Sequence, residues 1–260
     1  MREMSSTPSP VDSTSTSATS TGPVPGLLWV TTSILRKDLP SSLLDAWYEE
    51  HIVDVLACPG NGGLFLRYKN IDQTADPYVD PKFAERATPS ASEKCIVETL
   101  WPNLALVKLS DLAWLTSKQF DDMPRHSKLL PPEPDGSIGS AFSCWNGALR
   151  SYETVGKTDD HTGGTSRPKY LLSVQTRTAD ESIWKALDDK YATLPGFRGS
   201  IRYRVVEGLL EFGEPGALPA GIVLYEFDGE APPSVLADDH HLRADVWELT
   251  KEAGDLSLRL

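Results

Sequence analysis

Apolar residues in the first half of the chain change from strand spacing to helical spacing and back. Residues 26–34 (GLLWVTTSI) are rich in apolar and β-branched side chains, which predicts a strand. A helix start at Pro40-Ser41-Ser42 follows, and apolar residues then recur at helical spacing as far as Ala57. Further strands are predicted over 64–68, 103–109 and 142–155, with a short helix after Ser110. The resulting order is strand, helix, strand, strand, helix, strand.

The second half of the chain repeats this order. Strands are predicted over 170–175, 199–206, 221–227 and 242–250, and helices over 179–194 and 232–239. Two segments match in detail, because 43–69 and 183–204 each run from an amphipathic helix through a Pro-Gly turn to a strand containing Arg-Tyr. Self-similarity of this kind indicates a fold that is built by duplication.

Each half has the element order of a ferredoxin-like split βαβ unit. Two helices can cover one face of a four-stranded sheet, but the other face of the sheet still needs cover. Two such sheets that face each other within one chain solve this problem. We therefore predict an α+β fold in which two ferredoxin-like halves are fused into a pseudo-dimeric α+β barrel.

The predicted domain boundaries follow from local composition. Residues 1–24 are Ser/Thr-rich and are expected to form a disordered tail rather than a signal peptide. Residues 25–155 form the first barrel half, and 169–260 form a second, degenerate half. The Gly/Asp/Thr-rich segment 156–168 is the expected linker between the halves.

Composition narrows the range of partners. The net charge of −12 disfavours binding to nucleic acid or to an anionic membrane, and no apolar run approaches the length of a membrane span. The three cysteines, Cys58, Cys95 and Cys144, lack metal-site spacing, and their odd number argues against a disulfide framework. We therefore expect a cytoplasmic protein. No pattern indicates a nucleotide, flavin or metal cofactor.

His51 is the strongest candidate for chemistry, because only the first of the two matching helices carries a histidine. It follows Trp47 by four residues and Leu44 by seven, which places it on the apolar stripe that faces the sheet. An imidazole in an apolar pocket can act as a general acid or base, since its reference pKa is about 6.5. Asp54, three residues later, could orient the ring. The alternative is a core histidine that is satisfied by a backbone carbonyl.

The other candidate site residues are aromatic or apolar. Tyr68 is the second polar candidate, because its hydroxyl could hydrogen-bond a substrate carbonyl or enolate. The candidate pocket walls for a flat, apolar ligand are Trp29, Trp47, Val55, Trp145 and Tyr152. Each of these residues could instead belong to an ordinary core.

The run Trp47-Tyr48-Glu49-Glu50-His51, followed by Pro59-Gly60 and Arg67-Tyr68, resembles the EthD-like branch of the dimeric α+β-barrel superfamily. Members often show a Trp-Tyr-x-x-Glu-His pattern in the first helix, and the spacing here is one residue shorter. The fused double copy looks like members found in fungal natural-product pathways. The resemblance implies a pocket between the sheet and the helices of one half. Enzymes of this fold include cofactor-independent cyclases, dehydratases, isomerases, decarboxylases and monooxygenases, and haem-dependent relatives also exist. The resemblance therefore implies an activity of one of these kinds.

These observations lead to three hypotheses about function. The first is a cofactor-independent cyclase, dehydratase or isomerase, with a pericyclic reaction included, that acts on a small hydrophobic polyketide- or terpenoid-like intermediate. The second is a cofactor-free monooxygenase of the same fold, and the third is a non-catalytic ligand-binding or accessory protein. A chain that pairs its own sheets has less need of a partner, so we expect a monomer or a weak homodimer.

Overall fold

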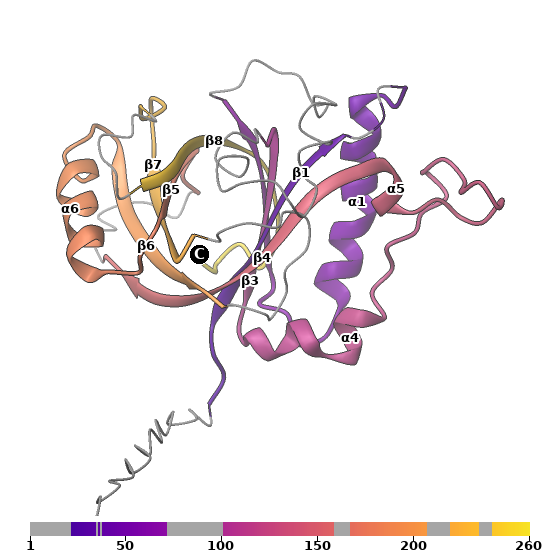
Figure 1. The fold of residues 1–260 in the computed structure, drawn as a ribbon, viewed down its shortest axis with the longest axis horizontal. Helices are drawn as coiled ribbons and strands as arrows, with labels where there is room; N and C mark the ends of the chain where they lie inside the picture. Colours follow the sequence, from indigo (N-terminus) through magenta and orange to yellow (C-terminus); the bar gives the residue numbers. More distant parts are fainter. Residues whose placement is uncertain are drawn as a thin grey trace, which may run out of the picture.

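Eight antiparallel strands close into a barrel in the computed structural model (Figure 1). The structure describes residues 22–34, 36, 38–71, 101–158, 167–206, 219–233 and 241–260. The strands are β1 (Gly26–Ile34), β2 (Leu64–Asn70), β3 (Asn103–Leu109), β4 (Trp145–Lys157), β5 (Tyr170–Thr176), β6 (Phe197–Val205), β7 (Gly221–Phe227) and β8 (His241–Gly254). Their order around the barrel is β1-β3-β2-β8-β5-β7-β6-β4.

This order confirms the predicted pair of ferredoxin-like halves. The first half contributes the run β4-β1-β3-β2, and the second contributes the same run, β8-β5-β7-β6. Antiparallel pairing of β2 with β8 and of β4 with β6 joins the two sheets at both seams. Each sheet therefore has one face inside the barrel and one face outside it, and no strand edge is left open.

The barrel interior is filled by side chains from both halves. Successive residues of a strand point to opposite faces, so Leu27 and Trp29 point inward while Leu28 and Val30 point outward. Trp29 packs edge-on against Tyr152 and Trp247, with ring centroids 6.4 and 6.0 Å apart. The interior is thus a packed core rather than a channel.

The helices cover the outer faces of the two sheets, on opposite sides of the barrel (Figure 1). The first face carries α1 (Ser41–Ala57), the 3-10 helix η1 (Leu112–Thr116), α4 (Lys118–Asp121) and α5 (Ala141–Cys144). The second face carries α6 (Glu181–Tyr191). Helix α1 buries five residues at helical spacing, which are Leu44, Trp47, Tyr48, Ile52 and Val55. It ends before Pro59 and Gly60, and the glycine adopts a φ of 89° that other residues rarely adopt.

Several predicted element boundaries change in the structure. The predicted strand over 142–155 is wrong at its start, because Ser140 caps a short helix, α5, and the strand begins only at Trp145. Helix α6 is shorter than predicted, because the side chain of Asp180 caps its first turn and the helix ends at Tyr191. Asp111 rather than Ser110 caps η1. The predicted tail up to Thr21 and most of the predicted 232–239 helix lie outside the described residues.

Strand β4 continues to Lys157, two residues beyond the predicted end of the first half, and β5 begins at Tyr170. Among the residues that the structure describes, no helix is long and apolar enough to cross a membrane.

Candidate functional site

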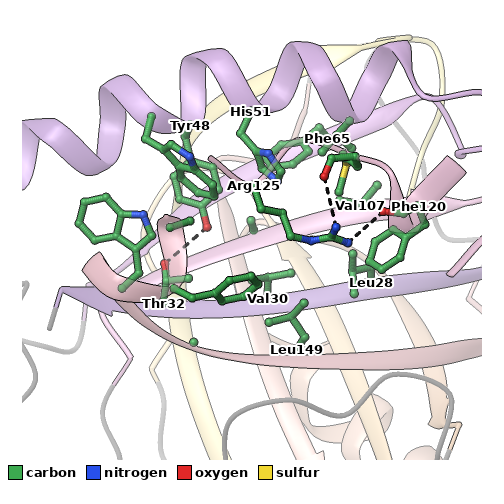
Figure 2. Close-up of a pocket in the computed structure, with 18 of the residues that line it drawn as sticks. Leu28, Val30, Thr32, Tyr48, His51, Phe65, Val107, Phe120, Arg125 and Leu149 are labelled. Carbon is green, nitrogen blue, oxygen red and sulfur yellow. Dashed lines mark hydrogen bonds between the residues drawn. The ribbon is translucent and has the colours of Figure 1, made fainter. Parts of the chain in front are cut away.

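A cavity of about 110 Å³ lies between α1 and the outer face of the first sheet (Figure 2). Strands β1 to β4 form its floor, α1 forms its roof, and the segment from η1 to α5 closes its side. Its described lining is mostly apolar and comprises Leu28, Val30, Trp47, Val55, Phe65, Ala105, Val107, Trp114, Phe120, Met123, Ala141, Phe142, Trp145, Gly147 and Leu149. The polar lining residues are Thr32, Tyr48, His51 and Arg125.

His51 lies on the cavity side of α1, as its helical spacing predicts. Its ring stacks on Trp47, with centroids 4.5 Å apart and planes 15° apart. The backbone of Pro124 also interacts with the imidazole and favours its protonated form. Burial, together with the positive charge of Arg125, lowers the pKa of His51 to about 4. The expectation of a group that titrates near neutrality is therefore corrected, because the imidazole is neutral at pH 7.

Tyr48 is a polar group of the cavity that the sequence reasoning did not single out. Its hydroxyl lies 3.5 Å from the Thr32 hydroxyl, and the Arg67 guanidinium lies 4.1 Å from the centre of its ring. Burial raises the pKa of Tyr48, so the phenol keeps its proton. The signal was present, since Tyr48 belongs to the buried stripe of the helix and to the Trp-Tyr motif.

Arg125 is the second polar group that the sequence reasoning missed. It lies in the segment between α4 and α5, and its side chain extends beneath His51 toward Phe120 (Figure 2). Its guanidinium donates hydrogen bonds to the carbonyl oxygens of Phe120, Asp121 and Met123, at distances of 2.9, 2.9 and 3.2 Å. No periodicity marks this irregular segment, so its position over the cavity depends on tertiary structure.

Tyr68, Trp29 and Tyr152 do not line the cavity, which corrects their predicted roles. All three side chains point into the barrel interior, on the opposite face of the sheet from His51. The reason is the twofold alternation of a strand. On β2 the outward positions belong to Phe65 and Arg67, so the Tyr68 hydroxyl cannot reach a ligand that is bound under α1.

The remaining predicted residues divide between the cavity and its surroundings. Trp47, Val55 and Trp145 line the cavity, and their role in binding a ligand stays a prediction. Asp54 is only half-buried and lies outside the lining. Among the described residues, its carboxylate makes no hydrogen bond to His51. The backbone of Pro124, rather than Asp54, interacts with the imidazole.

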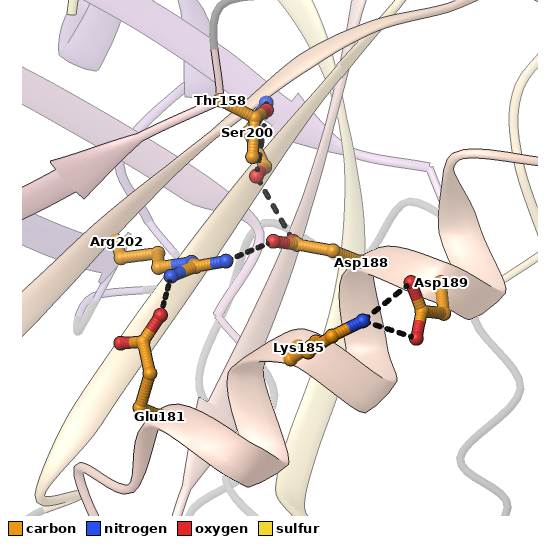
Figure 3. Close-up of polar contacts among 7 residues, drawn as sticks. All are labelled: Thr158, Glu181, Lys185, Asp188, Asp189, Ser200 and Arg202. Atoms are coloured by element: carbon orange, nitrogen blue, oxygen red, sulfur yellow. Dashed lines mark hydrogen bonds and ion pairs between the residues drawn. The ribbon is translucent and has the colours of Figure 1, made fainter.

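The equivalent face of the second half carries a buried apolar cluster and a group of ion pairs between α6 and β6, which Figure 3 shows. Asp188 on α6 accepts a hydrogen bond of 2.9 Å from the Ser200 hydroxyl and pairs with Arg202. Arg202 also pairs with Glu181 at the start of the same helix. Leu187, which is buried, occupies the position of His51, because each lies eight residues before the proline of its Pro-Gly turn.

The cavity thus combines a neutral imidazole, a phenol and one fixed cation with apolar walls. Such a lining suits an apolar small molecule that is oriented by a few polar contacts. Over the described ranges, no group of three or more His, Cys, Asp or Glu side chains is arranged to hold a metal ion. The class of protein that fold and site define is an internally duplicated α+β barrel with a mostly apolar cavity under its first helix.

Comparison with known proteins adds one relative in sequence. The chain is 26% identical to core atranone cluster protein 1 of the fungus Stachybotrys chlorohalonatus over 253 residues, which is 89% of this chain and 92% of that protein. No family model matches the chain, so the EthD-like branch stays a prediction.

Two bacterial structures named "putative monooxygenase" resemble the chain at low similarity. The structure from Lactobacillus acidophilus is 10% identical, with a TM-score of 0.39, and the match covers 89% of this chain and 96% of that one. The structure from Fusobacterium nucleatum is also 10% identical, with a TM-score of 0.40 and coverage of 90% and 95%.

Proposed function

We propose that this protein is a cofactor-independent enzyme that cyclises, dehydrates or isomerises a small, mostly apolar biosynthetic intermediate. The observation that carries the proposal is the placement of His51. A neutral imidazole is stacked on Trp47 inside an apolar cavity, at a position where the other half of the same fold has a leucine. A core histidine needs no cavity beside it, whereas a histidine that contacts a substrate does.

The chemistry available to His51 follows from its neutral state. A neutral imidazole can accept a proton from a substrate or hydrogen-bond a substrate oxygen, but it cannot start the reaction as a charged acid. A pKa of about 4 makes it a weak base in the free protein. Proton removal by His51 is therefore favoured only for an acidic substrate position, or where ligand binding offsets the charge of Arg125.

The other lining residues would act by position. The walls formed by Trp47 and Trp145 can hold a flexible apolar chain in a folded, reactive conformation, which accelerates a ring closure even when no proton moves. Tyr48 can donate a hydrogen bond to a substrate oxygen by releasing its long contact with Thr32.

The fungal relative supports a biosynthetic role, because its name assigns that protein to the atranone cluster. The two proteins match over nearly their whole lengths, although at 26% identity the substrates can differ. We propose for this chain the same setting, a pathway for a natural product.

The test begins with the compound that accumulates when the gene is deleted in the producing organism. Purified wild-type protein and the His51→Ala variant are added to it, and the products are identified by mass spectrometry. We expect the wild-type protein to yield a product of equal mass, or one lighter by a single water, and the variant to yield far less. Circular dichroism of both proteins shows whether the variant is folded.

Two other outcomes would replace the proposal. A gain of oxygen with oxygen uptake and no added cofactor would identify a cofactor-free monooxygenase. Tight binding of the compound without turnover would identify a ligand-binding protein. Equal rates for wild-type and His51→Ala proteins would remove His51 from the mechanism while leaving the reaction itself intact.

A further inference from the structure

Arg125 presents a fixed guanidinium at the cavity with donors to spare. Three backbone carbonyls accept hydrogen bonds from it, two from Nη1 and one from Nη2, and the group lies 5.0 Å from the centre of the Phe120 ring. A guanidinium has five N–H donors in a planar fork. The Nε–H and one Nη2–H therefore have no acceptor among the described residues. A cation held this rigidly is organised in advance for one more partner.

The charge of Arg125 is not neutralised by the protein. The buried Arg67 pairs with Asp45, and Arg202 pairs with Asp188, yet no carboxylate of a described residue comes within ion-pair distance of Arg125. Carbonyl dipoles stabilise the guanidinium but do not cancel its charge. A partly buried charge without a counter-ion is unfavourable, so a ligand that brings negative charge would be favoured at this position.

The rest of the cavity lining brings no negative charge. Its described residues include no aspartate or glutamate. His51 and Tyr48 are both neutral. A ligand that complements this lining is apolar over most of its surface and carries an oxygen that accepts hydrogen bonds.

We propose that the cavity binds an apolar small molecule with one anionic oxygen, and that Arg125 binds this oxygen through its Nε–H and remaining Nη2–H. The oxygen belongs to a carboxylate or to the enolate of a 1,3-dicarbonyl, which share this chemistry. Such a molecule would be the substrate of the proposed enzyme. The choice of this cavity as the site rests on the proposed function. Binding of an anion here also offsets the charge that faces His51, which raises the pKa of the imidazole and makes it a better base.

Calorimetric titration of the full-length protein near pH 7.5 tests the proposal with defined probes. The probes are 2-naphthoic acid, 1-phenylbutane-1,3-dione and the neutral naphthalene-2-carboxamide. We expect the wild-type protein to bind at least one acidic probe about tenfold or more tightly than the carboxamide. In Arg125→Gln, that acidic probe should lose roughly 10- to 100-fold in affinity, while the carboxamide should change by less than about threefold.

Lys118→Gln is the matched control, because it removes the same charge from the neighbouring helix α4. Lys118 is exposed, pairs with Asp122 and does not line the cavity, so the preference for the acid should persist in this variant. The test compares the affinity for the acidic probe with the affinity for the carboxamide in the same variant. A partly misfolded Arg125→Gln protein would bind both probes more weakly, so the ratio of the two affinities would not change.

Each outcome has a defined meaning. Selective loss for the naphthoate indicates a carboxylate ligand, and selective loss for the dione indicates an enolate. The proposal is overturned if the wild-type protein binds neither acidic probe, shows no preference over the carboxamide, or keeps its preference in Arg125→Gln. Failure of the proposed enzymatic function can be distinguished from failure of the anion-binding proposal. In the first case, the protein would bind acids in an Arg125-dependent way but would not convert the accumulated intermediate.

Discussion

The barrel has two equivalent helix–sheet faces, one under α1 and one under α6, and different side chains occupy the space between helix and sheet. Both keep an ion pair between the strand arginine and the first turns of the helix, Arg67 with Asp45 and Arg202 with Glu181. Asp45 and Glu181 even lie equally far before their Pro-Gly turns. Under α1 there is a cavity, whereas under α6 the corresponding space contains packed aromatic rings and a buried carboxylate.

One helical turn accounts for much of this difference. The first face has His51 and Ile52 where the second has Leu187 and Asp188. Asp188 ties its helix to the sheet through Ser200 and Arg202, whereas Ile52 contributes only apolar contacts to the packing of α1. The first face also gains the segment between β3 and β4, which supplies Arg125 and closes the cavity. The duplicated fold therefore has two equivalent faces that carry different side chains.

Exchanging the residues at this turn should have the largest effect on activity. His51→Leu makes the first face like the second, and we expect turnover to fall by roughly 10²- to 10⁴-fold if the imidazole moves a proton. Leu187→His, the reciprocal change, should leave turnover within about twofold, because that side chain lies far from the cavity. Steady-state kinetics on the two folded variants measures both; equal losses would contradict a functional difference between the faces.

The next largest difference between the two faces should be in how their stability depends on pH, because only the first face has a buried histidine in its helix. The pKa of His51 is about 4 in the folded protein and about 6.5 in an unfolded chain, so the unfolded chain binds the proton that the folded protein excludes. Stability from the neutral imidazole is fully present above pH 6.5. It is lost as the pH falls to 4, by about 3 kcal/mol.

Urea unfolding of the wild-type and His51→Leu proteins at pH 7 and at pH 4 measures this loss. The difference in unfolding free energy between the two proteins should shift by that amount in favour of the leucine variant at low pH. A constant difference across the two pH values would show that His51 is not shielded from solvent as the structure indicates.

Removing the buried carboxylate should affect the second face alone. Asp188→Ala removes a carboxylate that binds both Arg202 and the Ser200 hydroxyl in a mostly buried place. Arg202 keeps its ion pair with Glu181, and the Ser200 hydroxyl keeps its contact with Thr158, so we expect a loss of about 2 kcal/mol in unfolding free energy. Asp189→Ala is the control, since that exposed residue pairs with Lys185 on the surface of α6 and its loss should cost less than about 0.5 kcal/mol. Activity that falls with Asp188→Ala at full folding would reveal unexpected coupling between the faces.

The smallest effects should come from single hydroxyl groups. Tyr48→Phe removes a hydroxyl of the cavity, and we expect about a tenfold loss in kcat/KM with less than about 0.5 kcal/mol lost in stability, because the Tyr48–Thr32 contact is long. Tyr68→Phe removes an unpartnered hydroxyl inside the barrel and should leave kcat/KM unchanged. The reverse ranking of the two variants would restore Tyr68 as the polar group of the site.

Sequence patterns were sufficient to predict most secondary-structure elements and to predict which side of α1 faces the sheet. The strands over 26–34, 103–109 and 221–227 match the structure at both ends, because apolar runs between turn residues constrain strands strongly. His51, Trp47 and Val55 face the cavity because helical spacing assigns a face once one buried residue is known. The repeated Pro-Gly turn and Arg-Tyr strand predicted the duplicated architecture that the strand order confirms.

Tertiary structure decided which face of each strand meets a ligand and what closes the cavity. Along β2, side chains alternate between the two faces of the sheet, so Tyr68 and Arg67 lie on opposite faces. Both faces of a barrel strand are buried here, so the hydrophobic pattern does not indicate which face adjoins the helix. That ambiguity misplaced Tyr68, Trp29 and Tyr152. Arg125 reaches the cavity from an irregular segment whose path is set by its own carbonyl contacts and by packing on Phe120. The sequence by itself determined the elements and their duplication, because periodicity is local; only the closed barrel determined the site, because its lining comes from segments far apart in the chain.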